Sequence, residues 1–331
     1  MRLTRRTLLA SASASLAAPA IAQVDPFAAA LTRAQSFHQL RSLIVKVDGE
    51  TRVADAIRGP ALERPANIKS VSKSIVAVLT GIAIDKGAIP GVNAAVEDIA
   101  PHLLPNSASP DAAKITVEDL VTLRAGLERT SGPNYGSWVS SRNWVANALS
   151  RPIVAAPGTR MLYSTGSTHI LGALLSEATG ESLLTLARLW IGNPLDIEIP
   201  AWTRDPQGYY LGGNEMAISP LDLSRFAEMI RQGGSWEGER IVSQDWLNRS
   251  FTPVTRSPWS GLGYGYGWFL GTASGHAYAL ARGYGGQVVA IAPSLNISIT
   301  ITSDPNRPAR SGGYFGDLMG LIENDIIATL A

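Results

Sequence analysis

Ser70 and Lys73 have residue types and a spacing that could support acyl transfer. Residues i and i+3 share one face of a helix, so the Ser70 hydroxyl and the Lys73 amine can meet there. A serine hydroxyl becomes a strong nucleophile when a base takes its proton. Lys73 can act as that base if it is neutral, and burial at a helix N-terminus favours the neutral amine. The free backbone N–H of Ser70 can also face a developing oxyanion.

The sequence Ser70-Val71-Ser72-Lys73 is the only S-x-x-K in a chain that has five lysines. An exposed lysine one turn into a surface helix would give the same pattern. Here the surrounding helix is otherwise apolar, with Val71, Ile75 and Val78 among its residues. This context favours a buried amine, but the S-x-x-K site alone leaves the catalytic pair and the surface lysine equally open.

Two further sequences are candidates for the same site. Tyr163 precedes a predicted helix, and a phenol near a charged lysine can have a lowered pKa and relay a proton to a leaving group. A tyrosine that caps the core would fit the same position. In Gly283-Tyr284-Gly285-Gly286-Gln287, glycine lets the backbone approach a ligand and expose an N–H. A tight hairpin turn is the alternative reading.

Local patterns predict the elements that carry these residues. A helix is expected over 70–86, with Gly87 as its C-terminal cap. A hairpin is expected over 42–57, turning at Asp48-Gly49. Thr116, followed by an acidic residue three positions later, is a predicted N-cap.

The remaining pattern changes along the chain from helical to strand-like. Helices are expected at 117–123, 169–178, 182–190 and 220–232, and strands at 264–270, 276–281, 288–292 and 297–302. An amphipathic helix over 315–330 closes the chain. This order predicts an α+β fold: an antiparallel sheet built from N- and C-terminal segments with flanking helices, plus an inserted, mainly helical lobe. The sheet lobe should span about 23–80 and 255–331, and the helical lobe about 81–254.

Residues 1–22 are predicted to be an export signal. Arg2, Arg5 and Arg6 precede a short apolar run, and Ala20-Ile21-Ala22 is a cleavage signal. The arginine pair resembles a twin-arginine signal, with an ordinary secretory signal as the alternative. The apolar run is too short for a permanent membrane anchor. We therefore expect an exported protein, in the periplasm or secreted.

Composition excludes several other kinds of chemistry. The formal net charge is +1 without a basic stripe, so no nucleic-acid partner is expected. The chain has no cysteine, which excludes thiol catalysis and Cys-ligated zinc. No G-x-S-x-G elbow is present, and the four histidines form no metal-binding motif: His38, His102, His169 and His276. His169 follows Tyr163 closely and could reach the site, although a hydrogen-bonded helix residue is expected. No metal or cofactor is predicted.

The chain resembles the serine β-lactamase and penicillin-binding-protein-like superfamily, in particular its class C-like esterases and amidases. Three sequences carry this resemblance, in this order along the chain: the S-x-x-K sequence, the stretch around Tyr163 and the Gly-Tyr-Gly-Gly-Gln sequence. The resemblance covers nearly the whole mature chain. The short form of the third sequence is similar to that of nylon-oligomer (aminohexanoate-dimer) hydrolases and related carboxylesterases.

The resemblance implies a role for each candidate residue. Ser70 would be the acylated nucleophile and Lys73 its general base. Tyr163 would be the tyrosine of the family's Tyr-x-Asn motif. The backbone N–H of Tyr284, with Gly285 beside it, would form the oxyanion hole together with that of Ser70.

Two departures from the family pattern bear on the substrate. Thr165 replaces the asparagine of Tyr-x-Asn, and the Lys-Thr-Gly element has no cation in its counterpart, although Arg282 is adjacent. We therefore expect hydrolysis of small or medium carboxylic esters, and of some amides. A β-lactamase or D,D-peptidase is one alternative, and a non-catalytic ligand-binding or sensor protein is another. The oligomeric state stays open.

Aromatic side chains in loops are expected to line the substrate cleft, although several should cap the core instead. The candidates are Tyr135, which is also a candidate substrate-binding residue, Trp138, Trp144, Tyr209, Tyr210 and Trp259.

Overall fold

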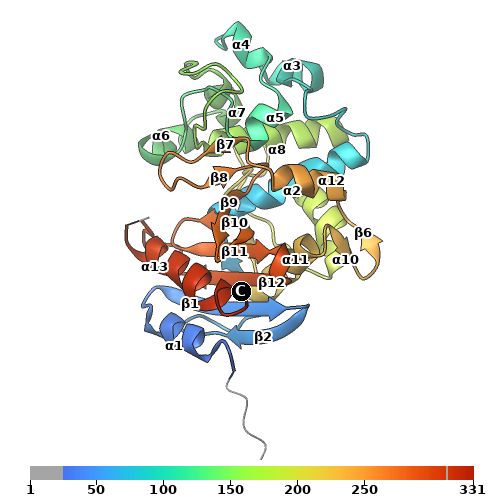
Figure 1. Cartoon of the computed structure of the whole chain (residues 1–331). Coiled ribbons are helices and arrows are strands. Elements are labelled where there is room, and N and C mark those ends of the chain that lie inside the picture. The colour runs from blue at the N-terminus through green and yellow to red at the C-terminus, as the bar shows by residue number, and fades with distance from the viewer. Residues whose placement is uncertain (1–24, 311) are drawn as a thin grey trace, which may run out of the picture.

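An antiparallel sheet of eight strands runs through the structure, a computed structural model that describes residues 25–310 and 312–331 (Figure 1). The strand order is β2-β1-β12-β11-β10-β9-β8-β7. The strands span Leu40–Val47 (β1), Glu50–Asp55 (β2), Thr255–Arg256 (β7), Gly263–Tyr264 (β8), Phe269–Ala273 (β9), His276–Gly283 (β10), Gln287–Ala292 (β11) and Ile297–Ser303 (β12). The N-terminal hairpin thus joins the C-terminal strands, as predicted. The export signal expected over residues 1–22 lies outside the described residues.

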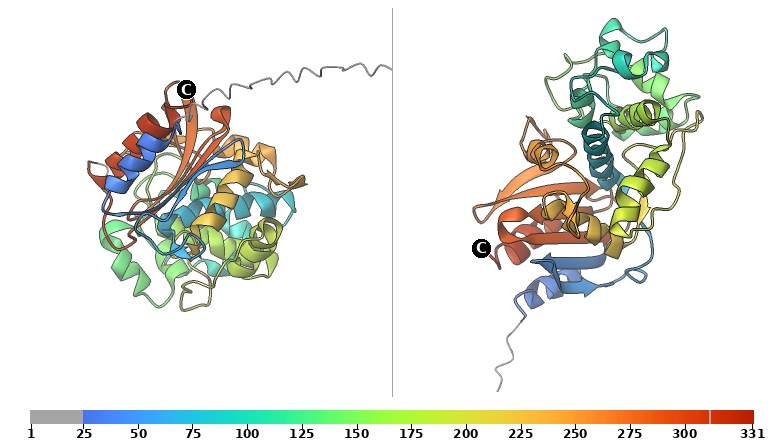
Figure 2. Two further views of the ribbon diagram at one scale, coloured as in Figure 1. Left: turned by 90° about the horizontal axis from the view of Figure 1, so that it is seen from below. Right: turned by 90° about the vertical axis from the view of Figure 1, so that its right-hand side faces the viewer.

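Helices cover both faces of this sheet (Figure 2). On one face lie α1 (Ala28–Ser36) and α13 (Tyr314–Gly320), which continues as a π-helical turn over Leu321–Ile327. On the other face lie α2 (Ser72–Asp85) and α11 (Pro220–Arg231). The predicted helical lobe, residues 81–254, therefore includes one helix, α11, that packs on the sheet.

Strand β11 shows how the sequence builds a core on each side. Successive side chains of a strand point to opposite faces. Val288 belongs to the same buried cluster as Phe315 of α13, whereas Val289 belongs to the cluster that contains Phe226 of α11. A strand buried on both faces is continuously apolar, which matches the sequence of β11.

The helical lobe fills the middle of the chain. Its helices in the described residues are α3 (Val96–Ile99), α4 (Pro110–Ala113), α5 (Val117–Val121), α6 (Tyr135–Val139), α7 (Trp144–Leu149), α8 (Thr165–Thr179), α9 (Leu183–Ala187), α10 (Asn193–Leu195) and α12 (Gln244–Ser250). Short 3₁₀ helices span Lys69–Val71, Pro101–Leu103, Gly132–Asn134 and Pro293–Leu295, and a π-helical turn spans Arg188–Gly192. Two small ribbons pair β3 (Ala66–Asn67) with β4 (Ala217–Ile218), and β5 (Ser235–Trp236) with β6 (Glu239–Arg240).

Several predicted turns and caps are confirmed. Asp48 and Gly49 have φ angles of 53° and 83°, as the hairpin turn requires. Thr116 accepts a hydrogen bond from the Asp119 N–H at 3.1 Å, and the Asp119 carboxylate accepts one from the Thr116 N–H at 3.0 Å. Gly87 has a φ of 72° after α2. Across the described part of the chain, no single helix is both long enough and apolar enough to cross a membrane.

The structure differs from the predicted elements in three places. The strand expected over 264–270 is divided between β8 and β9, because Gly267 has a φ of 82° and the Gly265 N–H donates to the Trp268 carbonyl. The helix expected from residue 70 begins as a 3₁₀ turn and becomes α-helical at Ser72. Helix α1 was not predicted, because it buries only Ala30 and Ala34 and has no clear apolar stripe.

Candidate active site

Ser70 follows a strained turn that leads into α2. The preceding residue, Lys69, has a left-handed φ of 51°, which is uncommon for a residue with a side chain. Asn67 holds this turn, since its Oδ1 accepts a hydrogen bond from the Lys69 N–H at 2.9 Å. Glu215 fixes both residues: its carboxylate lies 2.9 Å from Lys69 Nζ and accepts from Asn67 Nδ2 at 2.6 Å. These contacts hold the backbone that presents Ser70 to the cavity.

Lys73 lies one turn further along α2 and is only 2% exposed. Its Nζ lies 3.2 Å from Ser70 Oγ, 3.2 Å from Thr165 Oγ1 and 2.7 Å from the Gly213 carbonyl oxygen. Among the described residues, no carboxylate forms an ion pair with it. Burial lowers the pKa of Lys73 from 10.5 to about 7. The amine can therefore be neutral near pH 7 while it contacts the Ser70 hydroxyl.

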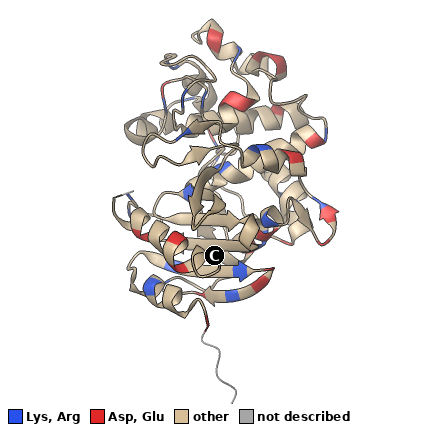
Figure 3. Cartoon of the chain, in the orientation of Figure 1, with Lys and Arg blue, Asp and Glu red and all other residues tan. Residues whose placement is uncertain are grey.

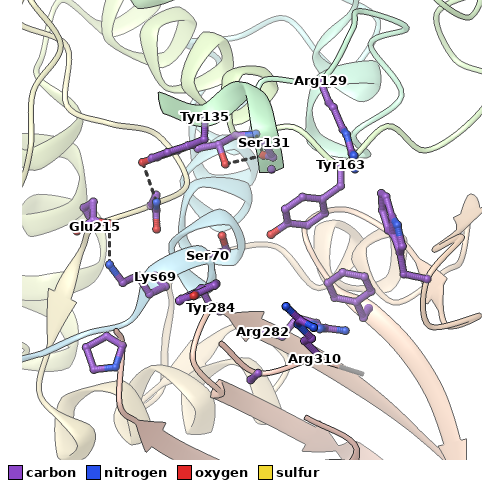
Figure 4. A pocket seen from close by; sticks show the side chains of 18 of the residues that line it. Lys69, Ser70, Arg129, Ser131, Tyr135, Tyr163, Glu215, Arg282, Tyr284 and Arg310 are labelled. Carbon is purple, nitrogen blue, oxygen red and sulfur yellow. Dashed lines mark hydrogen bonds and ion pairs between the residues drawn. The ribbon is translucent and has the colours of Figure 1, made fainter. Parts of the chain in front are cut away.

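Tyr163 lies on the loop before α8, and its hydroxyl points toward Ser70 (Figure 4). Lys73 Nζ lies 5.1 Å from the centroid of its ring. Burial raises the pKa of the Tyr163 phenol, and Ser70 and Arg282 offset this only in part. The expectation that a charged lysine lowers this pKa is therefore wrong: desolvation dominates, and Lys73 is itself shifted toward neutrality. A phenol that stays protonated is suited to donating a proton.

The turn between β10 and β11 brings Tyr284 close to Ser70 (Figure 4). A Cβ at Gly283 would lie 2.5 Å from the Ile68 carbonyl oxygen, so glycine is needed where the strand meets the nucleophile turn. Gly285 has a φ of 83°, which favours glycine for the same turn.

The backbone N–H groups of Ser70 and Tyr284 are candidate oxyanion donors. Neither donates a hydrogen bond to another group within residues 25–310 and 312–331. They come from a 3₁₀ turn and from a hairpin turn that both border the same cavity. Backbone N–H groups held in this way need no rearrangement when charge develops on a substrate oxygen.

Thr165 occupies the place where the family pattern has asparagine. Its Oγ1 contacts both Lys73 Nζ, at 3.2 Å, and Ser131 Oγ, at 3.1 Å. Ser131 also accepts a hydrogen bond from the Thr165 N–H at 2.9 Å. Thr165 therefore holds Lys73 and the loop that carries Ser131. Its hydroxyl makes these contacts at the position where the family pattern has an asparagine amide.

A cavity of about 830 Å³ is lined by Ser70, Tyr163, Thr165 and Tyr284. Of the loop aromatics expected there, Tyr135 and Trp259 line it, together with Phe269. The other aromatics lie elsewhere: Trp138, Trp144 and Tyr210 are buried in the core of the helical lobe, and Tyr209 donates a hydrogen bond to Glu177. Arg282, which the sequence alone could not place, also lines the cavity.

His169 is fully buried and does not line the cavity. Its Nε2 lies 3.1 Å from the Asp205 carboxylate, and both side chains are fully buried. Its Nδ1 accepts a hydrogen bond from the Gly212 N–H at 3.3 Å. The adjacent residue, Gly213, supplies the carbonyl oxygen that binds Lys73. The histidine therefore positions the segment that fixes the lysine amine.

We expect His169→Ala to lower kcat by about 10- to 100-fold with a small change in KM, because a displacement of about 1 Å at a reacting group is enough for such a loss. Steady-state kinetics on an ester across pH 6–9 would measure both parameters. His102→Ala is the matched control, because His102 is an exposed histidine paired with Glu177. An unchanged kcat in folded His169→Ala protein would contradict this positioning role.

Sequence reasoning missed several residues of the site. Ser131, Gly213 and Glu215 were not singled out, because only the folded loops bring them to Thr165, Lys73 and Lys69, respectively. No local motif marks them. In the described part of the chain, no three His, Cys, Asp or Glu side chains are grouped so that they could hold a metal ion.

Comparison with known proteins identifies the family. The chain belongs to the β-lactamase family, whose model matches residues 42–319. The fold and the family together define a β-lactamase-fold serine hydrolase.

Three solved structures share this fold at low sequence identity. A Bacillus anthracis protein assigned as a 6-aminohexanoate-dimer hydrolase is 16% identical, with a TM-score of 0.74 over 88% of this chain and 78% of that one. A penicillin-binding-protein homologue from Caulobacter crescentus is 17% identical, with a TM-score of 0.74 over 92% and 98% of the two chains. EstCE1, a hydrolase with promiscuous acyltransferase activity, is 18% identical, with a TM-score of 0.72 over 91% and 96%.

Proposed function

We propose that the protein hydrolyses carboxylic esters, and some amides, through an acyl-enzyme on Ser70. The observation that carries this proposal is the buried Lys73 amine, 3.2 Å from Ser70 Oγ and without a carboxylate partner in the described residues. A lysine whose pKa is about 7 can accept the serine proton at neutral pH. A purely structural lysine would gain from an opposite charge, and no Asp or Glu within residues 25–310 and 312–331 pairs with Lys73.

In the acylation step, Ser70 Oγ attacks the carbonyl carbon while Lys73 takes its proton. The oxyanion accepts hydrogen bonds from the Ser70 and Tyr284 backbone N–H groups. Tyr163 gives its proton to the leaving oxygen or nitrogen, and Lys73 can restore it. The carbon–oxygen or carbon–nitrogen bond then breaks, leaving the acyl group on Ser70.

In the deacylation step, a water molecule takes the place of the leaving group. Tyr163 passes its own proton to the neutral amine of Lys73 and accepts the water proton as the bond between the water oxygen and the acyl carbon forms. The collapse of the second tetrahedral intermediate returns the proton to Ser70 and releases the acid. The same residues serve both steps because the two steps are chemically the reverse of each other.

Hydrolysis of 4-nitrophenyl acetate and butyrate by the mature protein tests this proposal. Turnover of both esters at rates well above the uncatalysed reaction is expected. Labelling of Ser70 by a penicillin, without ester turnover, would instead support the β-lactam and cell-wall-peptide alternative. Absence of both reactions would favour a ligand-binding protein.

A further inference from the structure

We infer that the cavity selects esters whose leaving group is aromatic and carries a carboxylate, an inference that rests on the proposed hydrolysis at Ser70. The cavity is lined by four basic side chains and a single acidic one, Glu215. That carboxylate is already engaged by Lys69 and Asn67. The positive charge of the other lining residues is therefore not balanced by the cavity wall.

Three of the basic residues are arginines: Arg129, Arg282 and Arg310. Over the described ranges 25–310 and 312–331, none of them forms an ion pair with an Asp or Glu side chain. Elsewhere in the chain, basic and acidic residues are interspersed (Figure 3). A guanidinium group stays charged at any physiological pH, so these charges must be met by water or by an anionic ligand.

Arg282 is the most constrained of the three. Its guanidinium carbon lies 3.5 Å from the centroid of the Phe315 ring and 5.5 Å from that of Phe269. Burial lowers the pKa of this guanidinium, which reflects its incomplete hydration. The aromatic rings offset only part of this desolvation, and a carboxylate that binds the guanidinium gains more than it would at the surface.

The arginines lie on one side of the nucleophile. Arg282 and Arg310 are on the Tyr163 side of Ser70, whereas Tyr135 and Glu215 are on the opposite side (Figure 4). In the proposed mechanism Tyr163 protonates the leaving group, so the leaving group enters this side. The acyl group then extends toward Tyr135.

The same side presents a set of aromatic rings. Tyr163 packs against Trp259 at 6.5 Å and against Phe269 at 6.4 Å between ring centroids. Trp259 is 54% exposed, which is unusual for so large an apolar side chain, and Arg129 lies 5.5 Å from its ring. Rings and guanidinium groups side by side fit an aromatic group with a negative charge.

A matched pair of acetate esters tests this inference. Both 3-carboxy-4-nitrophenyl acetate and 4-nitrophenyl acetate release a nitrophenol, and only the first leaving group carries a carboxylate. With each kcat/KM divided by the uncatalysed rate constant, we expect the wild type to prefer the carboxylated ester by about 10-fold or more. Arg282→Gln should remove most of this preference. Arg310→Gln should lower the preference by about 3-fold, because an ion pair between an exposed arginine and a carboxylate is weaker.

Arg307→Gln is the matched control, because Arg307 is an exposed arginine of the same loop as Arg310 and does not line the cavity. Its preference should equal that of the wild type. Equal rates for the two esters in a Ser70-dependent reaction would overturn the inference and leave the proposed function standing. If neither ester is hydrolysed, the inference on the leaving group and the proposed function are both overturned. If Arg282→Gln does not fold, Arg310→Gln decides, because its side chain is exposed.

Discussion

Ser70→Ala is expected to lower kcat/KM for 4-nitrophenyl butyrate by about 10⁴-fold or more, to the residual level that binding and the oxyanion hole alone can support. The variant loses the atom that would form the acyl-enzyme. Because Lys73, Tyr163 and the Tyr284 turn stay in place, its KM should change little. Mass spectrometry of wild-type protein mixed with an activated ester should show an acyl adduct on Ser70 that the variant lacks.

Ser74→Ala is the matched control for this experiment. Ser74 lies on the same helix and donates a buried hydrogen bond to the Gly267 carbonyl at 2.6 Å. Its loss should lower the free energy of unfolding by about 1 to 3 kcal/mol without removing a reacting group. A thermal melt and a kinetic assay on both variants then separate loss of stability from loss of chemistry. Equal activity of wild type and Ser70→Ala would show that another residue is the nucleophile.

The sequence predicted those parts of the fold that depend on local patterns. The hairpin at Asp48-Gly49, the Thr116 cap and the strand-like period after residue 250 each arise from a few neighbouring residues. The S-x-x-K pair is also local, since Ser70 and Lys73 lie one turn apart on one helix face. Helix α1 escaped prediction because packing against the sheet lobe, rather than its own apolar pattern, stabilises it.

The electrostatics of the site could not be predicted from local patterns. Lys73 is held by the Gly213 carbonyl, 140 residues away in sequence, and its neutral form is favoured by burial that the whole fold creates. The direction of the Tyr163 pKa shift was wrong for the same reason, because burial outweighed the expected effect of a neighbouring charge. Arg282 was visible in the sequence, but only the fold shows that it borders the cavity.

Replacing Lys73 should affect activity and stability in opposite directions. Lys73→Met removes the proton acceptor and is expected to lower kcat by about 10³-fold or more. Lys73→Arg is the informative companion, because an arginine keeps the positive charge but cannot accept a proton near neutral pH. Both variants should therefore be inactive. An active Lys73→Arg enzyme would mean that the charge matters and the basicity does not.

The pH dependence follows from the lowered pKa of Lys73. Wild-type kcat/KM should rise through a pKa of about 7, because the amine must be neutral to accept the Ser70 proton. The same amine titrates near 10.5 in the unfolded chain. Between these values the unfolded state binds more protons than the folded state, so folding stability increases as the pH rises from about 7 to 10.5.

Lys73→Met removes this titration from the folded and unfolded states alike. At pH 6 the buried charge is unfavourable in the wild type, so the variant should be more stable by up to about 5 kcal/mol, because each pKa unit between 10.5 and about 7 corresponds to about 1.4 kcal/mol. The difference should shrink toward zero as the pH approaches 10.5, and urea unfolding of both proteins at several pH values would measure it. A difference that does not vary with pH would show that the amine is charged throughout and cannot be the general base. A stability difference that decreases between pH 7 and pH 10.5, together with the loss of activity, would support Lys73 as the general base. It would mean that the buried amine costs the fold stability and at the same time provides a neutral base beside the nucleophile.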